Sequence, residues 1–172
     1  MKLDKLYAAQ AELKKYIGYT GKDKFSKMML AMLVEFMECA NDWRGFKYWS
    51  EDKQPKKTLL EEYSDGLHFV LETGLDLAEG GHIMMLPNRI TADDIPLRDR
   101  CKSPVKQYKD LVRAVLWLED VIDGDDYIDD VYIALFEDYL NLGRLLGFTE
   151  EQITEAYMSK NQVNHERQNN GY

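Results

Sequence analysis

The sequence contains few cysteines and no long apolar run, and both features narrow the kind of protein it can be. Cysteine occurs twice in 172 residues, at Cys39 and Cys101, which is too few for a disulfide framework and favours a reducing compartment. No stretch approaches the roughly 18 consecutive apolar residues of a membrane helix, and residues 1–7 lack the apolar core of a signal peptide. We therefore expect a cytoplasmic protein with no membrane partner.

Basic charge is also scarce. The chain has 22 lysines and arginines against 31 aspartates and glutamates, a formal net charge of −9. This balance argues against a protein that binds nucleic acid by general electrostatic attraction. It still allows a nucleotide ligand, because a bound metal ion can reverse the sign of a small pocket.

Strand-like alternation never persists for more than a few positions, and the chain has no repeat or low-complexity tract. With 45% apolar and 31% charged residues, a chain of this length can bury one core. Apolar spacing and end signals predict helices over residues 2–17, 23–42, 58–79, 104–122, 127–146 and 150–168. We expect an all-α single domain over residues 1–172, built as a bundle of five or six helices.

The helix ends and faces carry further expectations. Two capping boxes are predicted, one from Thr58 with Glu61 and one from Thr149 with Gln152, and Ser103 before Pro104 fits a helix start. Residues 82–103 could be a long loop, a short helix or an arm against a second copy, and residues 123–126 are interpreted as a turn and not a calcium loop. The expected inward residues include Leu3, Leu6, Leu13 and Ile17, then Met29, Leu33, Phe36 and Met37, and then Val105, Tyr108, Val112, Val115 and Leu116.

Two short acidic pairs lie inside apolar helical stretches, Glu35 with Glu38 and Glu62 with Asp65. A spacing of three places both carboxylates of a pair on one helix face. Two such helices packed antiparallel would gather four carboxylates, which cannot all stay ionised without a counter-charge. For an all-oxygen cluster that counter-charge is usually Mg²⁺ or a similar hard cation. The alternative is that all four acids are ordinary solvated residues on outer helix faces.

His68 follows Asp65 by three residues, a spacing also used by di-iron carboxylate bundles. Those bundles need the pattern on two helices, and here it occurs once. We therefore interpret His68 as a hydrogen-bonded packing residue.

The C-terminal helix concentrates basic and amide side chains. Lys160, Asn164 and Arg167 follow one another at i, i+4 and i+7 and so share a face. An ammonium, an amide and a guanidinium together suit a triphosphate. The alternative is a solvated basic face at a helix C-terminus, where the helix dipole favours positive charge.

Taken together, these residues resemble a known family. The two acidic pairs are similar to the acidic motifs of the all-α nucleoside triphosphate pyrophosphatases, which include MazG-like enzymes. The pattern Tyr157-x-x-Lys160-Asn161-x-x-Asn164-x-x-Arg167-Gln168-x-x-Gly171-Tyr172 resembles the closing signature of the dimeric dUTPases, as do the runs 65–69 and 46–49.

The resemblance implies a homodimeric enzyme that hydrolyses dUTP, with dUDP as a second candidate substrate, and that uses two or more Mg²⁺ ions, or Mn²⁺ in their place. By resemblance, the metal ligands are Glu35, Glu38, Glu62 and Asp65. A carboxylate that is not fully used as a ligand could take the proton from the attacking water, and we assign this role to Glu38, with Glu35 as the second catalytic carboxylate. Lys160, Asn164 and Arg167 would contact the phosphates with support from Tyr157 and Asn161, and Gln10, Phe46 and Trp49 would lie near the base and sugar.

One position departs from the family pattern. Lys14 stands where the family tends to carry Asn or Asp shortly after the glutamine, which bears on how strictly uracil is read. The alternatives to a dUTPase are a nucleotide pyrophosphatase of broader specificity and a helical binding protein without catalysis.

Overall fold

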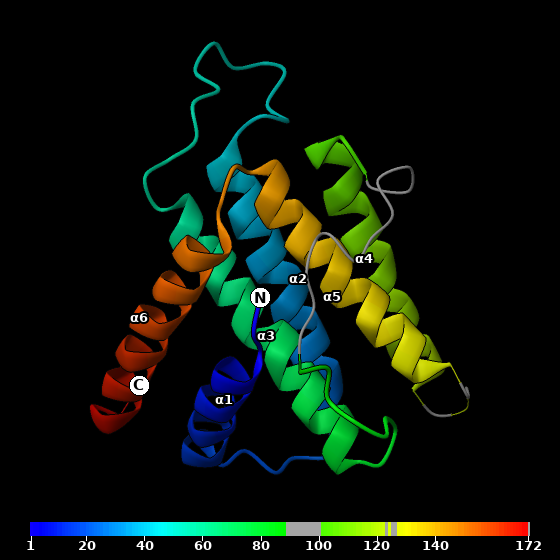
Figure 1. Cartoon of the computed structure of the whole chain (residues 1–172). Helices are drawn as coiled ribbons and strands as arrows, with labels where there is room; N and C mark the ends of the chain where they lie inside the picture. The colour runs from blue at the N-terminus through cyan, green and yellow to red at the C-terminus, as the bar shows by residue number, and fades with distance from the viewer. Residues whose placement is uncertain (89–100, 123, 125–126, 172) are drawn as a thin grey trace.

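The computed structural model describes residues 1–88, 101–122, 124 and 127–171, and every regular element in these residues is a helix. The six helices agree closely with the predicted ranges and confirm the all-α bundle (Figure 1). They are α1 (Asp4–Ile17), α2 (Lys24–Trp43), α3 (Leu59–Glu79), α4 (Pro104–Val121), α5 (Ile128–Leu145) and α6 (Glu150–Asn169).

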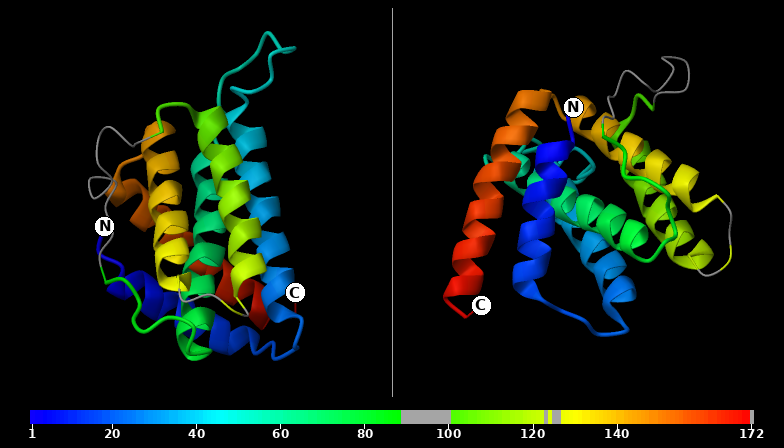
Figure 2. Two further views of the ribbon diagram at one scale, coloured as in Figure 1. Left: turned by 90° about the vertical axis from the view of Figure 1, so that its right-hand side faces the viewer. Right: turned by 60° about the horizontal axis from the view of Figure 1, so that its bottom comes forward.

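Helix α3 lies at the centre of the bundle. It packs against α1, α2, α5 and α6, and 12 of its 21 residues are buried, so it is covered on most sides. Helices α2 and α3 run antiparallel, as Figure 1 shows, and α1 and α6 lie side by side (Figure 2). The predicted antiparallel packing of the two acid-bearing helices is therefore confirmed.

Two glycines of α3 admit tyrosines from α5. The hydroxyl of Tyr139 donates to the Tyr63 carbonyl (2.5 Å) and that of Tyr132 to the Val70 carbonyl (3.1 Å). A Cβ atom on Gly66 would lie 2.4 Å from the Tyr139 oxygen, and one on Gly74 would lie 2.2 Å from the Tyr132 oxygen. Both distances are shorter than any van der Waals contact, so the absence of a side chain at these two positions sets the depth of the α3–α5 packing.

The helix starts at Ser103 and Thr149 are confirmed, including the capping box between Thr149 and Gln152. The predicted capping box at Thr58 is wrong. Its hydroxyl donates to Asp42 of α2 (2.5 Å), and Glu61 instead meets Lys160 of α6 (2.8 Å). In both cases a side chain from another helix replaces the local backbone partner.

Several predicted inward residues face outward. Ile17, Met37, Val105 and Leu116 are between 40% and 47% exposed, because their helices pack on one side only. In α4 the core face is formed by Tyr108, Leu111, Val115 and Leu118.

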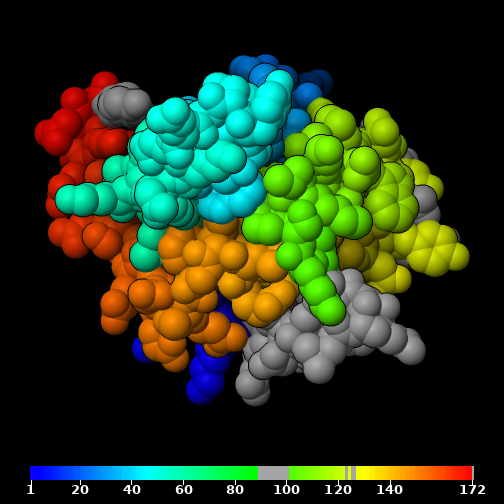
Figure 3. All heavy atoms as spheres, turned by 90° about the horizontal axis from the view of Figure 1, so that it is seen from above, coloured from blue at the N-terminus to red at the C-terminus, as the bar shows by residue number. Residues whose placement is uncertain are grey.

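Two connecting segments bear on function. Residues 44–58 form an extended loop beyond the ends of α2 and α3 (Figure 1), and in Figure 3 this loop (cyan) occupies part of the upper face beside α4 (green) and the α5–α6 connection (orange). In the segment after α3, Ile83 is buried while Met84 and Met85 are 97% and 80% exposed. The rest of the predicted arm, residues 89–100, and most of the predicted turn at 123–126 lie outside the described residues.

Candidate active site

Three of the four predicted carboxylates come together between α2 and α3. Glu35, Glu62 and Asp65 each offer an oxygen within 4.8 Å of the others, and all three side chains are half-buried. Glu35 comes from α2, whereas Glu62 and Asp65 occupy neighbouring positions on one face of α3. The site therefore depends on the antiparallel packing of these two helices.

Burial and mutual repulsion make this cluster costly to ionise. Burial raises the pKa of Glu35 to about 7, and the charges of Asp65, Glu38 and Glu62 add to the rise. The pKa values of Glu62 and Asp65 are raised as well, again chiefly by burial. An all-oxygen set that disfavours its own ionisation is a chemically suitable site for a hard divalent cation, which would relieve the repulsion.

Glu38 stands apart from the close trio. It lies one turn after Glu35 on α2 and is exposed, while its charge still raises the pKa values of Glu35 and Glu62. One further turn along, Asp42 is 4% exposed and accepts hydrogen bonds from Thr58 and Lys56. Asp42 therefore ties the end of α2 to the start of α3, next to the helix positions that carry the cluster.

A lysine from α6 supplies part of the counter-charge at this cluster. The Nζ atom of Lys160 lies 2.7 Å from Asp65 Oδ2 and 2.8 Å from Glu61 Oε1, and the residue is only 9% exposed. Burial disfavours its charge, but the two carboxylates outweigh burial and the pKa of Lys160 is raised. Arg167 of α6 is exposed, and its positive charge opposes the rise in the pKa of Asp65.

Next to this charged cluster lies a buried hydrogen-bonded network of neutral side chains. Gln10 Oε1 is 2.8 Å from both the Tyr157 hydroxyl and His68 Nδ1, and Gln10 Nε2 donates to Glu72 (3.0 Å). The rings of His68 and Tyr157 stack with centroids 4.2 Å apart. Gln10 is 1% exposed, so all its hydrogen-bonding groups are used inside the protein.

The network determines which nitrogen of His68 carries the proton. Burial lowers the pKa of His68 to about 3, so the ring is neutral, and its Nδ1 must donate to the Gln10 carbonyl oxygen. Its Nε2 is then an acceptor, and this buried atom has no hydrogen-bond partner among the described residues. A buried, unpaired acceptor three residues from Asp65 fits a ligand that brings its own N–H or O–H donor.

The remaining predicted site residues lie in different parts of the structure. Asn161 is buried and donates to the Ala9 carbonyl (3.4 Å), and Asn164 is half-buried. Phe46 and Trp49 lie in the exposed loop with ring centroids 5.8 Å apart. That loop is at the opposite end of the bundle from α1 in both Figure 1 and the left view of Figure 2, so the structure does not bring Phe46 or Trp49 next to Gln10.

A family model described as dUTPase matches residues 2–172, nearly the entire chain. The chain belongs to the dUTPase family. A search of curated proteins finds no match. As a dUTPase, the protein is a dUTP diphosphatase that hydrolyses dUTP to dUMP and pyrophosphate.

Two acids beside the carboxylate trio are not identified by the sequence pattern, because Glu61 is predicted as a cap and Asp42 is not singled out. The prediction that His68 is a hydrogen-bonded packing residue is confirmed, but its unpaired Nε2 is not predicted. The available signal was helical spacing: Asp42 follows Glu38 by four residues, Glu61 precedes Asp65 by four, and His68 follows Asp65 by three. Each therefore shares a helix face with a predicted ligand.

Lys14 of the dUTPase has its own partners. Its Nζ lies 2.6 Å from Asp76 and 2.5 Å from Glu79, and Lys24 of α2 binds Asp76 and Glu72. These ion pairs join α1, α2 and α3. Lys14 is connected through Asp76 and Lys24 to Glu72, and Glu72 accepts a hydrogen bond from Gln10, which is predicted to lie near the base.

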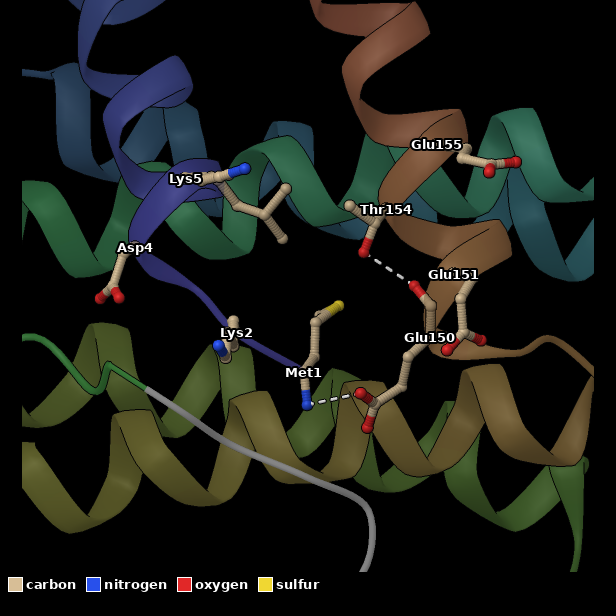
Figure 4. Close-up of a pocket in the computed structure, with 9 residues that line it drawn as sticks. Met1, Lys2, Asp4, Lys5, Glu150, Glu151, Thr154 and Glu155 are labelled. Atoms are coloured by element: carbon tan, nitrogen blue, oxygen red, sulfur yellow. Dashed lines mark hydrogen bonds and ion pairs between the residues drawn. The ribbon is translucent and has the colours of Figure 1, made fainter.

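A separate cavity of about 640 Å³ lies between the N-terminal residues and the start of α6 (Figure 4). The amino group of Met1 is 2.8 Å from Glu150 there, and the Thr154 hydroxyl donates to the Glu150 carbonyl. No predicted site residue lines this cavity.

Among the described residues, no helix combines the length and apolar character needed to cross a membrane.

Proposed function

We propose that dUTP hydrolysis depends on Mg²⁺, with two or more ions held by Glu35, Glu62 and Asp65 together with Glu38, and with Mn²⁺ as a substitute. The main observation that supports this proposal is the trio of carboxylates with oxygens within 4.8 Å of one another. Divalent cations bound there would screen the phosphate charge and make a nearby water more acidic. The raised pKa values of the trio support this assignment, because an ionised cluster needs added positive charge.

The phosphates of dUTP, or of dUDP, would lie along α6. Lys160 and Arg167 supply positive charge and Asn164 supplies an amide donor, all on one helix face. Tyr157 and Asn161 are buried and bonded to Gln10 and Ala9, so they support the phosphate-binding face from below. Arg167 and Asn164 would thus face the substrate together with Lys160 at the edge of the acid cluster, while Tyr157 and Asn161 hold α6 against α1.

The base would meet His68. Its unpaired Nε2 is an acceptor, which suits the N3–H of uracil and not the N3 lone pair of cytosine. Gln10 acts through His68, because its hydrogen bond fixes the ring tautomer. On this basis dCTP is rejected, whereas discrimination against dTTP needs a steric contact with the methyl group.

In the reaction a water oxygen attacks phosphorus and the bond to the departing pyrophosphate breaks. Glu38 would take the proton from this water, because it is exposed and lies outside the close trio, so it is the acid with most capacity to spare. Lys160 and Arg167 would stabilise the negative charge that develops on the pyrophosphate.

The test measures pyrophosphate release from dUTP, dCTP, dTTP and dATP, and orthophosphate release from dUDP, with Mg²⁺, Mn²⁺ or EDTA. We expect dUTP to be hydrolysed with either metal and not with EDTA, and Glu35→Gln and Asp65→Asn to lose turnover while keeping their helical circular-dichroism spectrum. Normal turnover in either variant would refute the metal assignment. Rapid hydrolysis of dCTP would support the broader-specificity alternative.

We also propose that the enzyme is a homodimer that joins through α2 and α4. The outer sides of these helices carry five aliphatic or methionine side chains that are at least 40% exposed: Leu30, Val34, Met37, Val105 and Leu116. Two hollows of about 380 and 300 Å³ lie on this face, one containing Leu30 and Leu116 and the other Met37 and Val112. A surface of this kind usually has a partner.

The charges at the two ends of this face favour a second copy as the partner. Ser26 of α2 donates to Glu119 of α4, and Tyr108 of α4 donates to Cys39 of α2, so the helices are antiparallel. The start of α4 carries Lys106 and Lys109, and its end carries Glu119 and Asp120. A twofold axis that lies in the plane of this face and perpendicular to the helix axes would bring the basic end of α4 in each copy to the acidic end of α4 in the other.

The proposed compartment is the cytoplasm. Cys39 and Cys101 are both free thiols, as expected for a protein in a reducing environment.

A further inference from the structure

Lys160 occupies a position that conflicts with its expected role in catalysis. Its ammonium group bridges Asp65 and Glu61 at 2.7 and 2.8 Å and is largely buried. Asp65 is also one of the three carboxylates expected to hold a cation. A divalent cation at Asp65 and the Lys160 ammonium would therefore share one carboxylate, and their positive charges would repel each other there.

The ammonium cannot simply be released from Asp65. A buried charge that loses its partner is strongly disfavoured, so leaving Asp65 without another partner would oppose cation binding. Glu61 offers that partner, because it lies one turn before Asp65 on the same face of α3 and already contacts Lys160. Its side chain is 53% exposed against 17% for Asp65, so it stands at the outer edge of the site.

We propose that Glu61 is a positioning residue that holds Lys160 beside the acid cluster as its counter-charge, and retains the ammonium at the edge of the site when a cation takes Asp65. This inference rests on the proposed function, since it assumes a divalent cation at Glu35, Glu62 and Asp65. Glu61 itself is outside the carboxylate trio. From the outer position, Lys160 is free to turn toward phosphate without crossing the cation site.

The experiment measures Mn²⁺ binding without nucleotide, using the electron paramagnetic resonance signal of free Mn²⁺. Four proteins form a double-mutant cycle: the parent, Glu61→Gln, Lys160→Met and the double variant. Lys160→Met should bind Mn²⁺ more tightly, because the ammonium that repels the cation is gone. Glu61→Gln should weaken binding at least about threefold when Lys160 is present, and less than about twofold in the Lys160→Met background, where only a screened exposed charge is lost.

Two further variants sharpen the result. Glu155→Gln removes an exposed acid of α6 and should leave Mn²⁺ affinity within about twofold of the parent. Lys160→Arg should bind Mn²⁺ more weakly than the parent, because a planar guanidinium can hold two carboxylates at once.

The outcomes separate this inference from the proposed function. A parent protein that neither binds Mn²⁺ nor releases pyrophosphate from dUTP refutes the proposed metal site. A parent that does both, but in which Glu61→Gln has no effect or the same effect in both backgrounds, overturns the role of Glu61.

Discussion

At the scale of single residues, His68 is the side chain whose protonation state most directly couples the site to stability. The ring is held neutral by burial, with its pKa lowered to about 3, whereas in the unfolded chain a histidine titrates near its usual value of about 6.5. At a pH between these two pKa values, His68 is protonated in the unfolded chain and neutral in the folded protein. The contribution of neutral His68 to the free energy of unfolding is therefore fully present above about pH 6.5 and is lost as the pH falls toward 3.

This gives a prediction for unfolding by urea at pH 7.5, 6 and 5. The parent should lose about 2 kcal/mol between pH 7.5 and 5 relative to His68→Gln, because glutamine cannot titrate but can still hydrogen-bond to Gln10. Taking the difference cancels the contributions of other titrating groups. Equal pH slopes for the two proteins would show that the ring is already accessible to protons in the folded state.

The sequence predicts the type and position of the acids well, because the helical period alone places Glu35 with Glu38 and Glu62 with Asp65 on single faces. It does not reveal their partners. Lys160 is 95 residues from Asp65, and Tyr157 is 147 residues from Gln10, so these contacts exist only once α6 has packed against α1 and α3. For the same reason the Thr58 and Glu61 pair was misread as a local cap.

At the scale of elements, the interface between α3 and α5 depends on hydroxyl groups that enter the space above glycines. The Tyr132 hydroxyl donates to the Val70 carbonyl and lies 2.8 Å from the Tyr7 hydroxyl. The Tyr132 oxygen stands where a side chain of Gly74 would be. This contact joins α1, α3 and α5 at one point.

We predict that Gly74→Ala lowers the free energy of unfolding by about 2 kcal/mol, although alanine is the better helix former. Tyr132→Phe alone should cost about 1 kcal/mol through its lost hydrogen bonds. Because phenylalanine removes the clashing oxygen, the double variant should lose clearly less than the sum. Strict additivity in urea unfolding would mean that the helices move apart without strain.

The existence and order of all six helices could be predicted from apolar spacing and end signals, and so could the starts at Ser103 and Thr149. The buried face of each helix was predicted less well. Met37 and Leu116 were predicted to point inward, but they are 43% and 47% exposed. Spacing identifies an apolar face and cannot say whether its partner belongs to the same chain.

At the scale of the whole molecule, the exposed apolar face of α2 and α4 bears on how the enzyme assembles. If α2 and α4 pack against the same helices of a second copy, Glu35 and Glu38 lie on a helix that also forms the interface. The acid cluster would then be supported from two sides, by α3 of its own chain and by the partner across the twofold axis.

We predict that the enzyme sediments at twice the 20.1 kDa mass of its chain at micromolar concentration. Leu116→Glu should reduce it to a single chain mass, because a carboxylate at the centre of an apolar interface meets its own copy across the axis. Met158→Glu places the same charge at a 43% exposed position of α6, away from α2 and α4, and should leave the dimer intact. A parent protein that sediments as a monomer would rule out this interface, whereas a dimer unaffected by Leu116→Glu would place the contact elsewhere, with the exposed Met84 and Met85 as the next surface to test.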